Sequence, residues 1–227
     1  MTGFDFMLYP VLVFSTIMVA AAPSASSKPV PQYTPAQIVA FDLAGLHLLT
    51  APSVVRAKLI VDGYVVQKPF IGGSVVPTWE SAILNEMDRR NGKQIPQRPG
   101  TFALNAEAES GEMITVLFST CNLNNEGLCT STITMKFREK VFRPAVAQRV
   151  AEKYPLYTDG DSTGKWWGVW NAKQYRVDTA YPHINFRQDH LVFFLTMKLG
   201  SKVSDEMDRL IQNEVDRRMP KNTELKI

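Results

Sequence analysis

The segment Met113-Ile-Thr-Val-Leu-Phe-Ser-Thr-Cys121-Asn-Leu-Asn-Asn-Glu-Gly-Leu-Cys129-Thr-Ser-Thr-Ile-Thr-Met-Lys-Phe137 contains the only two cysteines of the 227-residue chain. On the outer side of each cysteine the residues are mostly Thr, Ile, Val, Phe and Met, which fit the pleated surface of a β-sheet. The residues between the cysteines are typical of a turn. The segment therefore predicts an antiparallel hairpin with a Cys121–Cys129 disulfide near its loop.

The pairing of the two strands follows if the cysteines face each other. Leu117 then lies opposite Ile133 on a mostly apolar face, and Val116 lies opposite Thr134 on a second face rich in threonine. Directly opposed residues of a non-hydrogen-bonded pair are close enough for a disulfide. Closing so short a loop stabilises the fold by roughly 2–3 kcal/mol in the chain-entropy model. The alternative is two free thiols in a reducing compartment.

The N-terminus carries an almost wholly apolar stretch, residues 6–22, followed by the small residues Pro-Ser-Ala-Ser-Ser. This pattern is typical of a secretory signal peptide. We expect residues 1–22 to be removed by cleavage between Ala22 and Lys28, although Asp5 and the lack of Lys or Arg before the stretch are atypical. The alternative is an uncleaved anchor, because about 20 apolar residues span a bilayer. Either reading predicts a protein that is secreted, periplasmic or anchored outside the cytoplasm.

Composition predicts one domain after this leader. Residues 23–33 form a polar linker, and residues 34–227 form a single exported domain that is long enough for one sizeable core. Its charges are evenly scattered, and the formal net charge of the chain is +3. No block of Lys or Arg occurs, so we expect no nucleic-acid partner. Contact with a membrane is expected only through the N-terminal segment, if that segment stays uncleaved.

Hydrophobic periodicity predicts both helices and strands in this domain. Helices are expected from Thr34 onward and over residues 79–90, 144–154 and 204–219. Strands are expected at 101–107, 166–170, 175–179 and 191–199, besides a hairpin within 54–66 that turns at Asp62-Gly63. The last helix is expected to dock on the sheet through Met207, Leu210, Ile211 and Val215. The predicted fold class is α+β: a single domain with a mostly antiparallel sheet, about four helices packed mainly on one face, and one disulfide-closed hairpin.

One polar motif occurs twice, as Asn85-Glu-Met-Asp-Arg-Arg90 and as Asn213-Glu-Val-Asp-Arg-Arg218. In both places it ends a predicted helix that follows an apolar strand. One interpretation is a duplicated strand–helix unit. The alternative is that acidic residues before basic ones complement the dipole of each helix, and that two short motifs coincide.

The sequence contains no convergent catalytic or metal-binding pattern. Of the three histidines, His47 is expected in the core, His183 in a turn, and His190 just before a strand. A metal site needs about three ligands that converge, and the sequence does not supply them. Asp159 to Lys165 departs from phosphate-binding and calcium-binding loops and is expected to be an exposed turn. We therefore predict no catalytic residue, no metal and no cofactor.

Aromatic residues are concentrated in one region, and this cluster is the candidate ligand-binding surface. Strand alternation predicts that one side of the cluster packs on the core, while the other forms a platform for a glycan ring or a protein partner. The alternative is that the whole cluster is core. The cluster consists of Trp166, Trp167, Trp170, Tyr175 and Tyr181.

These patterns favour an exported, non-catalytic protein that binds a partner or ligand in the cell envelope or outside it. The expected partner is an envelope protein or a glycan. The alternative function is an extracytoplasmic hydrolase that acts on cell-wall or polysaccharide material. Such an enzyme requires paired acids, and the acids near the aromatic cluster are Asp159, Asp161, Asp178 and Asp189.

Overall fold

The computed structural model describes residues 33–67, 75–98, 100–101, 103–137, 148, 152–154, 164–168, 170–171, 176–177, 179–189 and 192–219. The predicted leader, 1–22, lies outside these residues, as does the predicted linker up to residue 32. Most of the predicted helix over 144–154 also lies outside them. Within that segment, Gln148, Glu152 and Lys153 are described and are helical.

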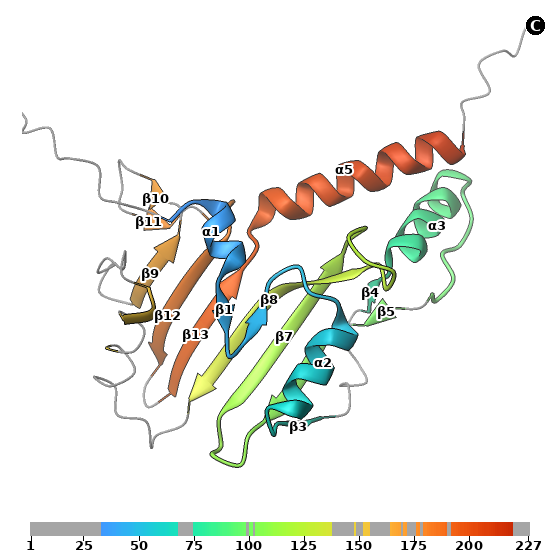
Figure 1. Ribbon diagram of the computed structural model, residues 1–227. Helices are drawn as coiled ribbons and strands as arrows, with labels where there is room; N and C mark the ends of the chain where they lie inside the picture. Colours follow the sequence, from blue (N-terminus) through green and yellow to red (C-terminus); the bar gives the residue numbers. More distant parts are fainter. Residues whose placement is uncertain are drawn as a thin grey trace, which may run out of the picture. The chain divides into compact units, whose positions relative to one another are not determined.

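A seven-stranded sheet, in which every strand pair is antiparallel, lies at the centre of the described fold (Figure 1). From edge to edge its strands are β3 (Val65–Val66), β6 (Ala103–Glu107), β7 (Met113–Thr120), β8 (Leu128–Phe137), β13 (Val192–Lys198), β12 (His183–Asp189) and β9 (Gly164–Gly168). The helices are α1 (Pro35–Ala40), α2 (Pro52–Val61), α3 (Trp79–Arg90) and α5 (Ser201–Arg218). These elements confirm the predicted α+β class.

Within the described residues, three two-stranded ribbons accompany the sheet. They are β1 (Asp42–Leu43) with β2 (Leu46–His47), β4 (Val76–Pro77) with β5 (Gly100–Thr101), and β10 (Trp170–Asn171) with β11 (Arg176–Val177). Each ribbon is antiparallel. The strands predicted at 101–107, 166–170, 175–179 and 191–199 correspond to β5–β6, β9–β10, β11 and β13, whereas β12 was not predicted.

The main core lies between one face of the sheet and the helices α1 and α2 (Figure 1). Along β7 every second residue is buried, including Ile114 and Val116, because successive strand residues point to opposite faces. Ile38 of α1 and Val55 and Leu59 of α2 are fully buried in the same cluster. On the opposite face, β6, β7, β8, β13 and β12 carry polar residues such as Thr115, Thr134 and Thr196, so a site built on polar groups is expected there.

The pairing of the hairpin strands differs from the predicted register, which was wrong. Val116 pairs with Ile133 instead of Thr134, and Thr115 pairs with Thr134. A bulge at Ser131 in β8 shifts the pairing further near the loop, so the two cysteines are not directly opposed. The observed register pairs the fully buried Val116 and Ile133 on the core face and leaves the threonines on the other face. Burial of these two branched side chains therefore outweighs the alignment of the cysteines.

The hairpin predicted within residues 54–66 was also wrong, because this segment forms α2. Pro52 occupies the first helical turn, where its missing N–H costs nothing. Val55 and Leu59 are four residues apart, so a helix places both on the face that packs on the core. Gly63, with a φ of 82°, follows the end of the helix instead of turning a hairpin. Tertiary packing thus overrides the strand preference of the valines and isoleucine.

The two longest helices pack on each other. α3 has its predicted bounds, whereas α5 begins three residues earlier than expected. The prediction that the stripe of α5 docks on the sheet was wrong, because Ile211 and Val215 pack on Ile83 of α3 in a separate apolar cluster. Val203, in the first turn of α5, contacts the main core. Two amphipathic helices therefore bury much of their apolar stripes against each other.

The repeated polar motif belongs to this helix pair. In each copy the glutamate accepts hydrogen bonds from the two arginines that end its own helix, Glu86 in α3 and Glu214 in α5. The hydrogen bond from Arg89 is the largest influence on Glu86 and holds the pKa of its carboxyl at about 2, well below the ordinary 4.5. Because α5 follows a strand of the main sheet and α3 follows the short ribbon strand β4, the surroundings of the two copies differ.

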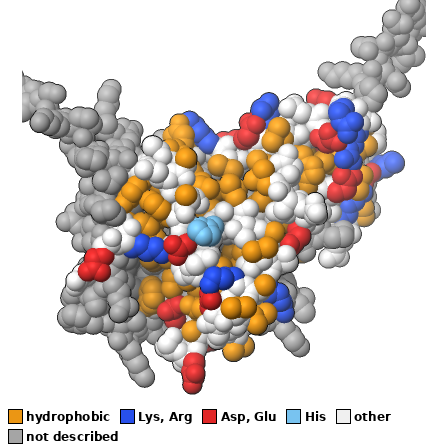
Figure 2. Space-filling model, viewed as in Figure 1, with side chains coloured by type: hydrophobic (Ala, Val, Ile, Leu, Met, Phe, Trp, Pro, Cys, Tyr) orange, Lys and Arg blue, Asp and Glu red, His pale blue; other side chains and the backbone are white. Residues whose placement is uncertain are grey.

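The second arginine of each copy also reaches across to the other helix. Arg90 donates to Asp216, and Arg218 forms a two-pronged ion pair with Glu80, with 2.9 Å between Nη2 and Oε2. Figure 2 shows basic and acidic side chains interspersed where α3 and α5 meet. Such surface pairs each contribute about 0–1 kcal/mol, so they orient the helix pair more than they stabilise it.

Candidate functional site

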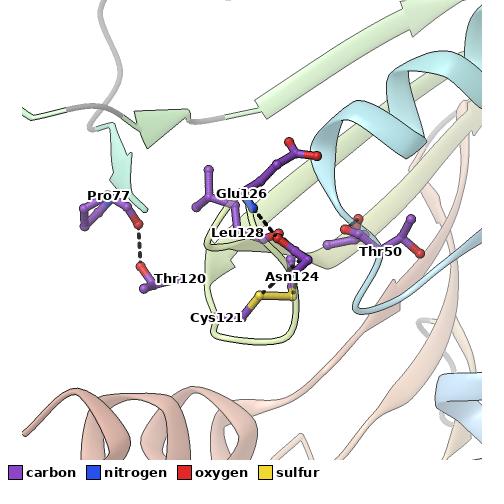
Figure 3. Close-up of a disulfide and its surroundings, with 9 residues drawn as sticks. Thr50, Pro77, Thr120, Cys121, Asn124, Glu126 and Leu128 are labelled. Carbon is purple, nitrogen blue, oxygen red and sulfur yellow. Dashed lines mark hydrogen bonds between the residues drawn. A yellow bond between two sulfur atoms is a disulfide. The ribbon is translucent and has the colours of Figure 1, made fainter. Parts of the chain in front are cut away.

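The predicted disulfide is present between Cys121, just after β7, and Cys129 in β8, with 5.7 Å between their Cα atoms. Both cysteines are buried. Asn124 fills the loop that the disulfide closes (Figure 3). Its Nδ2 donates to the Leu128 carbonyl at 2.8 Å, and its Oδ1 accepts from the Glu126 N–H at 3.0 Å. The loop is thus held by a covalent bond and by its own hydrogen bonds.

The disulfide loop also holds the first turns of two helices. The carboxylate of Glu126 accepts from the backbone N–H of Ser53 at 3.2 Å and from its hydroxyl, at the positive end of α2. The carbonyl of Gly127 accepts from the N–H of Trp79, the first residue of α3, at 2.9 Å. A Cβ on Gly127 would lie 2.5 Å from that nitrogen, so this contact requires glycine. The role of the disulfide region is therefore structural.

A pocket of about 340 Å³ opens where β13 leads into α5. Its walls combine hydroxyl side chains from the sheet, from the turn before β12 (residues 179–181) and from α5. The hydroxyl residues are Ser119, Ser131, Thr132, Thr179, Ser201 and Ser204. Lys198 and His183 from the ends of two neighbouring strands complete the polar lining, together with the short connection Leu199-Gly200.

Most of the polar groups in this pocket are not used by the protein. Ser131 Oγ donates to the carbonyl of Leu117 at 3.2 Å. Within the described part of the chain, the other lining hydroxyls form no side-chain hydrogen bond, and neither does the ammonium group of Lys198, which also forms no ion pair. Among the described residues of the lining there is no Asp or Glu. The pocket therefore offers several hydrogen-bond donors and one positive charge to a ligand.

The turn before β12 forms one wall and packs tightly against the start of α5. The N–H groups of Ser201 and Lys202 donate to the carbonyls of Thr179 and Ala180. Gly200 has a φ of 84°, and a Cβ there would lie 2.5 Å from the carbonyl oxygen of the neighbouring turn. These backbone bonds occupy the first amides of the helix. The donors that remain for a ligand are therefore side chains.

Two side chains, those of His183 and Lys202, hold this turn. His183 is 4% exposed, and its Nδ1 lies 2.8 Å from the carbonyl of Tyr181. A carbonyl can only accept, so Nδ1 carries the proton. The ammonium group of Lys202 lies 4.1 Å from the centre of the Tyr181 ring and also bonds its hydroxyl. Tyr181 is thus held in place beside the pocket.

A row of polar residues crosses the same face of the sheet, two residues along the strands from the pocket residues Thr132, Lys198 and His183. Across neighbouring strands it consists of Asn105, Thr115, Thr134, Thr196 and Asn185. Thr115 donates to Asn105 at 2.8 Å, and the hydroxyls of Thr134 and Thr196 lie 3.2 Å apart. Asn185 Oδ1 is buried and has no hydrogen-bond partner in the described structure. On this face Thr115, and not the predicted Val116, lies opposite Thr134, and the row of polar residues extends over five strands.

The predicted aromatic site is only partly described. Trp166 and Trp167 lie in β9, next to β12, and Trp170 begins β10. Tyr175 and the side chains of these tryptophans lie outside the described residues. Tyr181 is half-buried beside the pocket. The ligand role of the cluster stays a prediction, and Tyr181 is its link to the pocket.

The structure corrects two expectations for histidine. His183 lies at the start of a strand and is buried, whereas a turn was predicted. His47 is exposed, whereas a core position was predicted, because it alternates with the buried Leu46 and Leu48. His190 lies outside the described residues.

Sequence reasoning missed the pocket residues, and few signals point to them. Lys198, Thr132 and Ser204 come from three separate elements, so no local motif contains them. One available signal was the alternation of polar and apolar residues in His183-Ile-Asn-Phe-Arg-Gln-Asp189, which is typical of a strand with one buried face. It would have placed a polar strand face beside Lys198.

In the part of the chain that the structure describes, no three His, Cys, Asp or Glu side chains gather as metal ligands would. No helix among those residues is both long and apolar enough to cross a membrane. Comparisons with protein-family models, with curated proteins and with solved structures find no match to this chain. The function therefore has to be argued from the site itself.

Proposed function

We propose that the protein is an exported, non-catalytic protein that binds a ligand or partner in the cell envelope or outside it. The observation that carries this proposal is the pocket at the start of α5. Among its described residues it presents unused hydroxyls and the unpaired Lys198, but no carboxylate. Such a lining suits recognition of a polar molecule, because a few placed polar groups fix the orientation of a ligand.

The same lining favours binding over hydrolysis. A glycoside hydrolase of the usual type needs two carboxylic groups on either side of the bond that it breaks. Of the acids named as candidates, Asp189 ends β12, at the opposite end of that strand from the pocket residue His183. Asp159, Asp161 and Asp178 lie outside the described residues. A hydrolase therefore remains the alternative, and it would need paired acids that the described lining of the pocket does not contain.

Export is supported by the disulfide, since such bonds persist in oxidising compartments. We expect the mature chain to begin between Ala22 and Lys28. N-terminal sequencing of protein from its native host tests this expectation. Retention of Met1 or Met7 on membrane-bound protein would favour an anchor instead of a cleaved leader.

The binding proposal is tested by filling the pocket. In Ser204→Phe an aromatic ring occupies the space beside the sheet, whereas Ser110→Phe places the same ring in an exposed turn and serves as the control. Soluble fragments of host envelope polysaccharide are titrated into each protein, and binding is followed by NMR of the backbone amides. We expect binding to the native protein and to the control, and loss of binding in Ser204→Phe.

Turnover is checked in the same samples. We expect mass spectrometry to find the polysaccharide fragments unchanged after prolonged incubation. Cleaved products that disappear in Asp189→Asn would contradict the non-catalytic proposal and would favour the hydrolase. Binding that is equal in all variants would show that the ligand surface lies elsewhere, with the aromatic cluster as the next region to test.

A further inference from the structure

We propose that the pocket at the start of α5 takes a small anionic ligand that carries a phosphate or sulfate group. This inference rests on the proposed binding function and specifies its ligand class. It begins with charge. Among the described residues, the lining contains one lysine and neither Asp nor Glu, and Lys198 has no ion-pair partner. An ammonium group without a counter-charge attracts an anion and gains less from a neutral sugar.

The arrangement of donors favours a tetrahedral anion over a planar carboxylate. Unused hydroxyls approach from three walls: Thr132 from the sheet, Thr179 from the turn, and Ser204 from the helix. A phosphate or sulfate group presents three terminal oxygens in different directions, and each of them accepts hydrogen bonds. A carboxylate presents two oxygens in one plane. Donors on three sides are therefore matched best by the tetrahedral group.

The start of α5 adds partial positive charge beside the pocket. Its first turn contains no acidic residue, and the first carboxylates of the helix, Asp205 and Glu206, follow in the next turn. Lys202 is held by Tyr181 at the edge of the site. It contributes to the field without being available as a direct ligand.

The size of the pocket limits the ligand. At about 340 Å³ it is at the small end of the range for small-molecule sites. It suits a single phosphorylated or sulfated unit better than an extended polymer. Such a unit can be a free metabolite or the headgroup of a lipid, and both present the same group to Lys198.

The experiment measures binding of four probes to the full chain by NMR and calorimetry: inorganic phosphate, inorganic sulfate, glucose 6-phosphate and glucose. We expect glucose 6-phosphate to shift the amide signals of Thr132, Lys198 and Ser204, and glucose to leave them unchanged. Lys198→Gln is expected to weaken this binding by about tenfold or more, because a charge-assisted hydrogen bond is lost. Binding should also weaken as salt is added.

Two further variants complete the design. Lys93→Gln removes the same charge from an exposed position after α3 and is expected to bind as the native protein does. Lys198→Arg keeps the charge and is expected to retain most of the affinity. Thermal melting of each variant confirms that it is folded. Equal binding by native protein and Lys198→Gln, or equal binding of glucose and glucose 6-phosphate, would overturn the inference.

A separate experiment distinguishes a lipid headgroup from a free metabolite. The protein is cosedimented with phosphatidylcholine vesicles, with and without phosphatidic acid. If it sediments only with phosphatidic acid, and only when Lys198 is present, the anionic group belongs to a lipid. If none of the anions binds but neutral envelope glycans still require the open pocket, the anion inference is wrong and the proposed function stands. If neither anions nor glycans shift the amide signals of these residues, the anion inference and the proposed binding function are both wrong.

Discussion

Replacing both cysteines by alanine tests whether the disulfide loop stabilises the fold and holds its helices. Cys121 and Cys129 are 8 positions apart in the sequence. The chain-entropy model then gives a loss of about 2.5 kcal/mol in the free energy of unfolding. Alanine is preferred to serine because both positions are buried, and a buried hydroxyl without a partner would add its own cost. We expect the variant to fold, since the main core is unchanged.

Removal of the disulfide should also lower the local stability of the first turns of α2 and α3. Glu126 and Gly127 reach the first turns of α2 and α3 from within the closed loop. Without the disulfide the loop samples more conformations, so amide hydrogen exchange in both first turns is expected to accelerate. Urea unfolding supplies the global free energy, and hydrogen exchange followed by mass spectrometry supplies the local one.

Glu126→Gln is the matched control for the local effect. It keeps the disulfide and removes the charge at the start of α2, so it should accelerate exchange in α2 but not in α3, at a cost of about 0.5–1 kcal/mol. A loss below about 0.5 kcal/mol in the double alanine variant would refute the entropic reasoning. A full loss with unchanged exchange in both helices would show that the loop does not hold them.

Three further outcomes are expected. Ile211→Ala should lower the free energy of unfolding by about 2–5 kcal/mol in urea, because this residue is 7% exposed, whereas the half-buried Leu210→Ala should cost clearly less. The carboxyl of Glu86 has a pKa of about 2 instead of 4.5, so its contribution is full above pH 4.5 and is lost as the pH falls towards 2; Glu86→Gln should flatten this part of the stability profile measured by chemical denaturation. Gly127→Ala should unfold at a clearly lower temperature than Gly111→Ala, because both have a positive φ but an added Cβ collides with a neighbouring helix only at Gly127.

Local signals in the sequence predicted several elements well. The hairpin around the disulfide combines strand-forming residues with a polar turn, and the amphipathic pattern of α3 stops at Asn91-Gly92, so both were found with nearly correct bounds. The segment of α2 failed for the opposite reason. Its valines and isoleucine favour a strand locally, and its helix forms because Val55 and Leu59 are buried against the sheet.

The candidate pocket could not be predicted in the same way. Its residues come from β7, β8, β12, β13, α5 and a turn, and none of these segments contains a motif by itself. The partnership of α3 and α5 was equally hidden, although the repeated motif marks both helices. The apolar stripe of each helix is compatible with any apolar surface. The surface that α5 meets depends on where β13 ends, because α5 follows β13 directly.

The sequence by itself therefore determined the fold class, the disulfide and the two strands that carry it, because these depend on residue type and on contacts between near neighbours. The tertiary structure alone decided the register of that hairpin, the helical state of α2, the pairing of α3 with α5 and the meeting of Lys198 with hydroxyls from distant strands. The physical reason is that burial is a property of the assembled chain. A one-residue shift in register or a different helix partner changes little locally, but it decides which side chains leave water together.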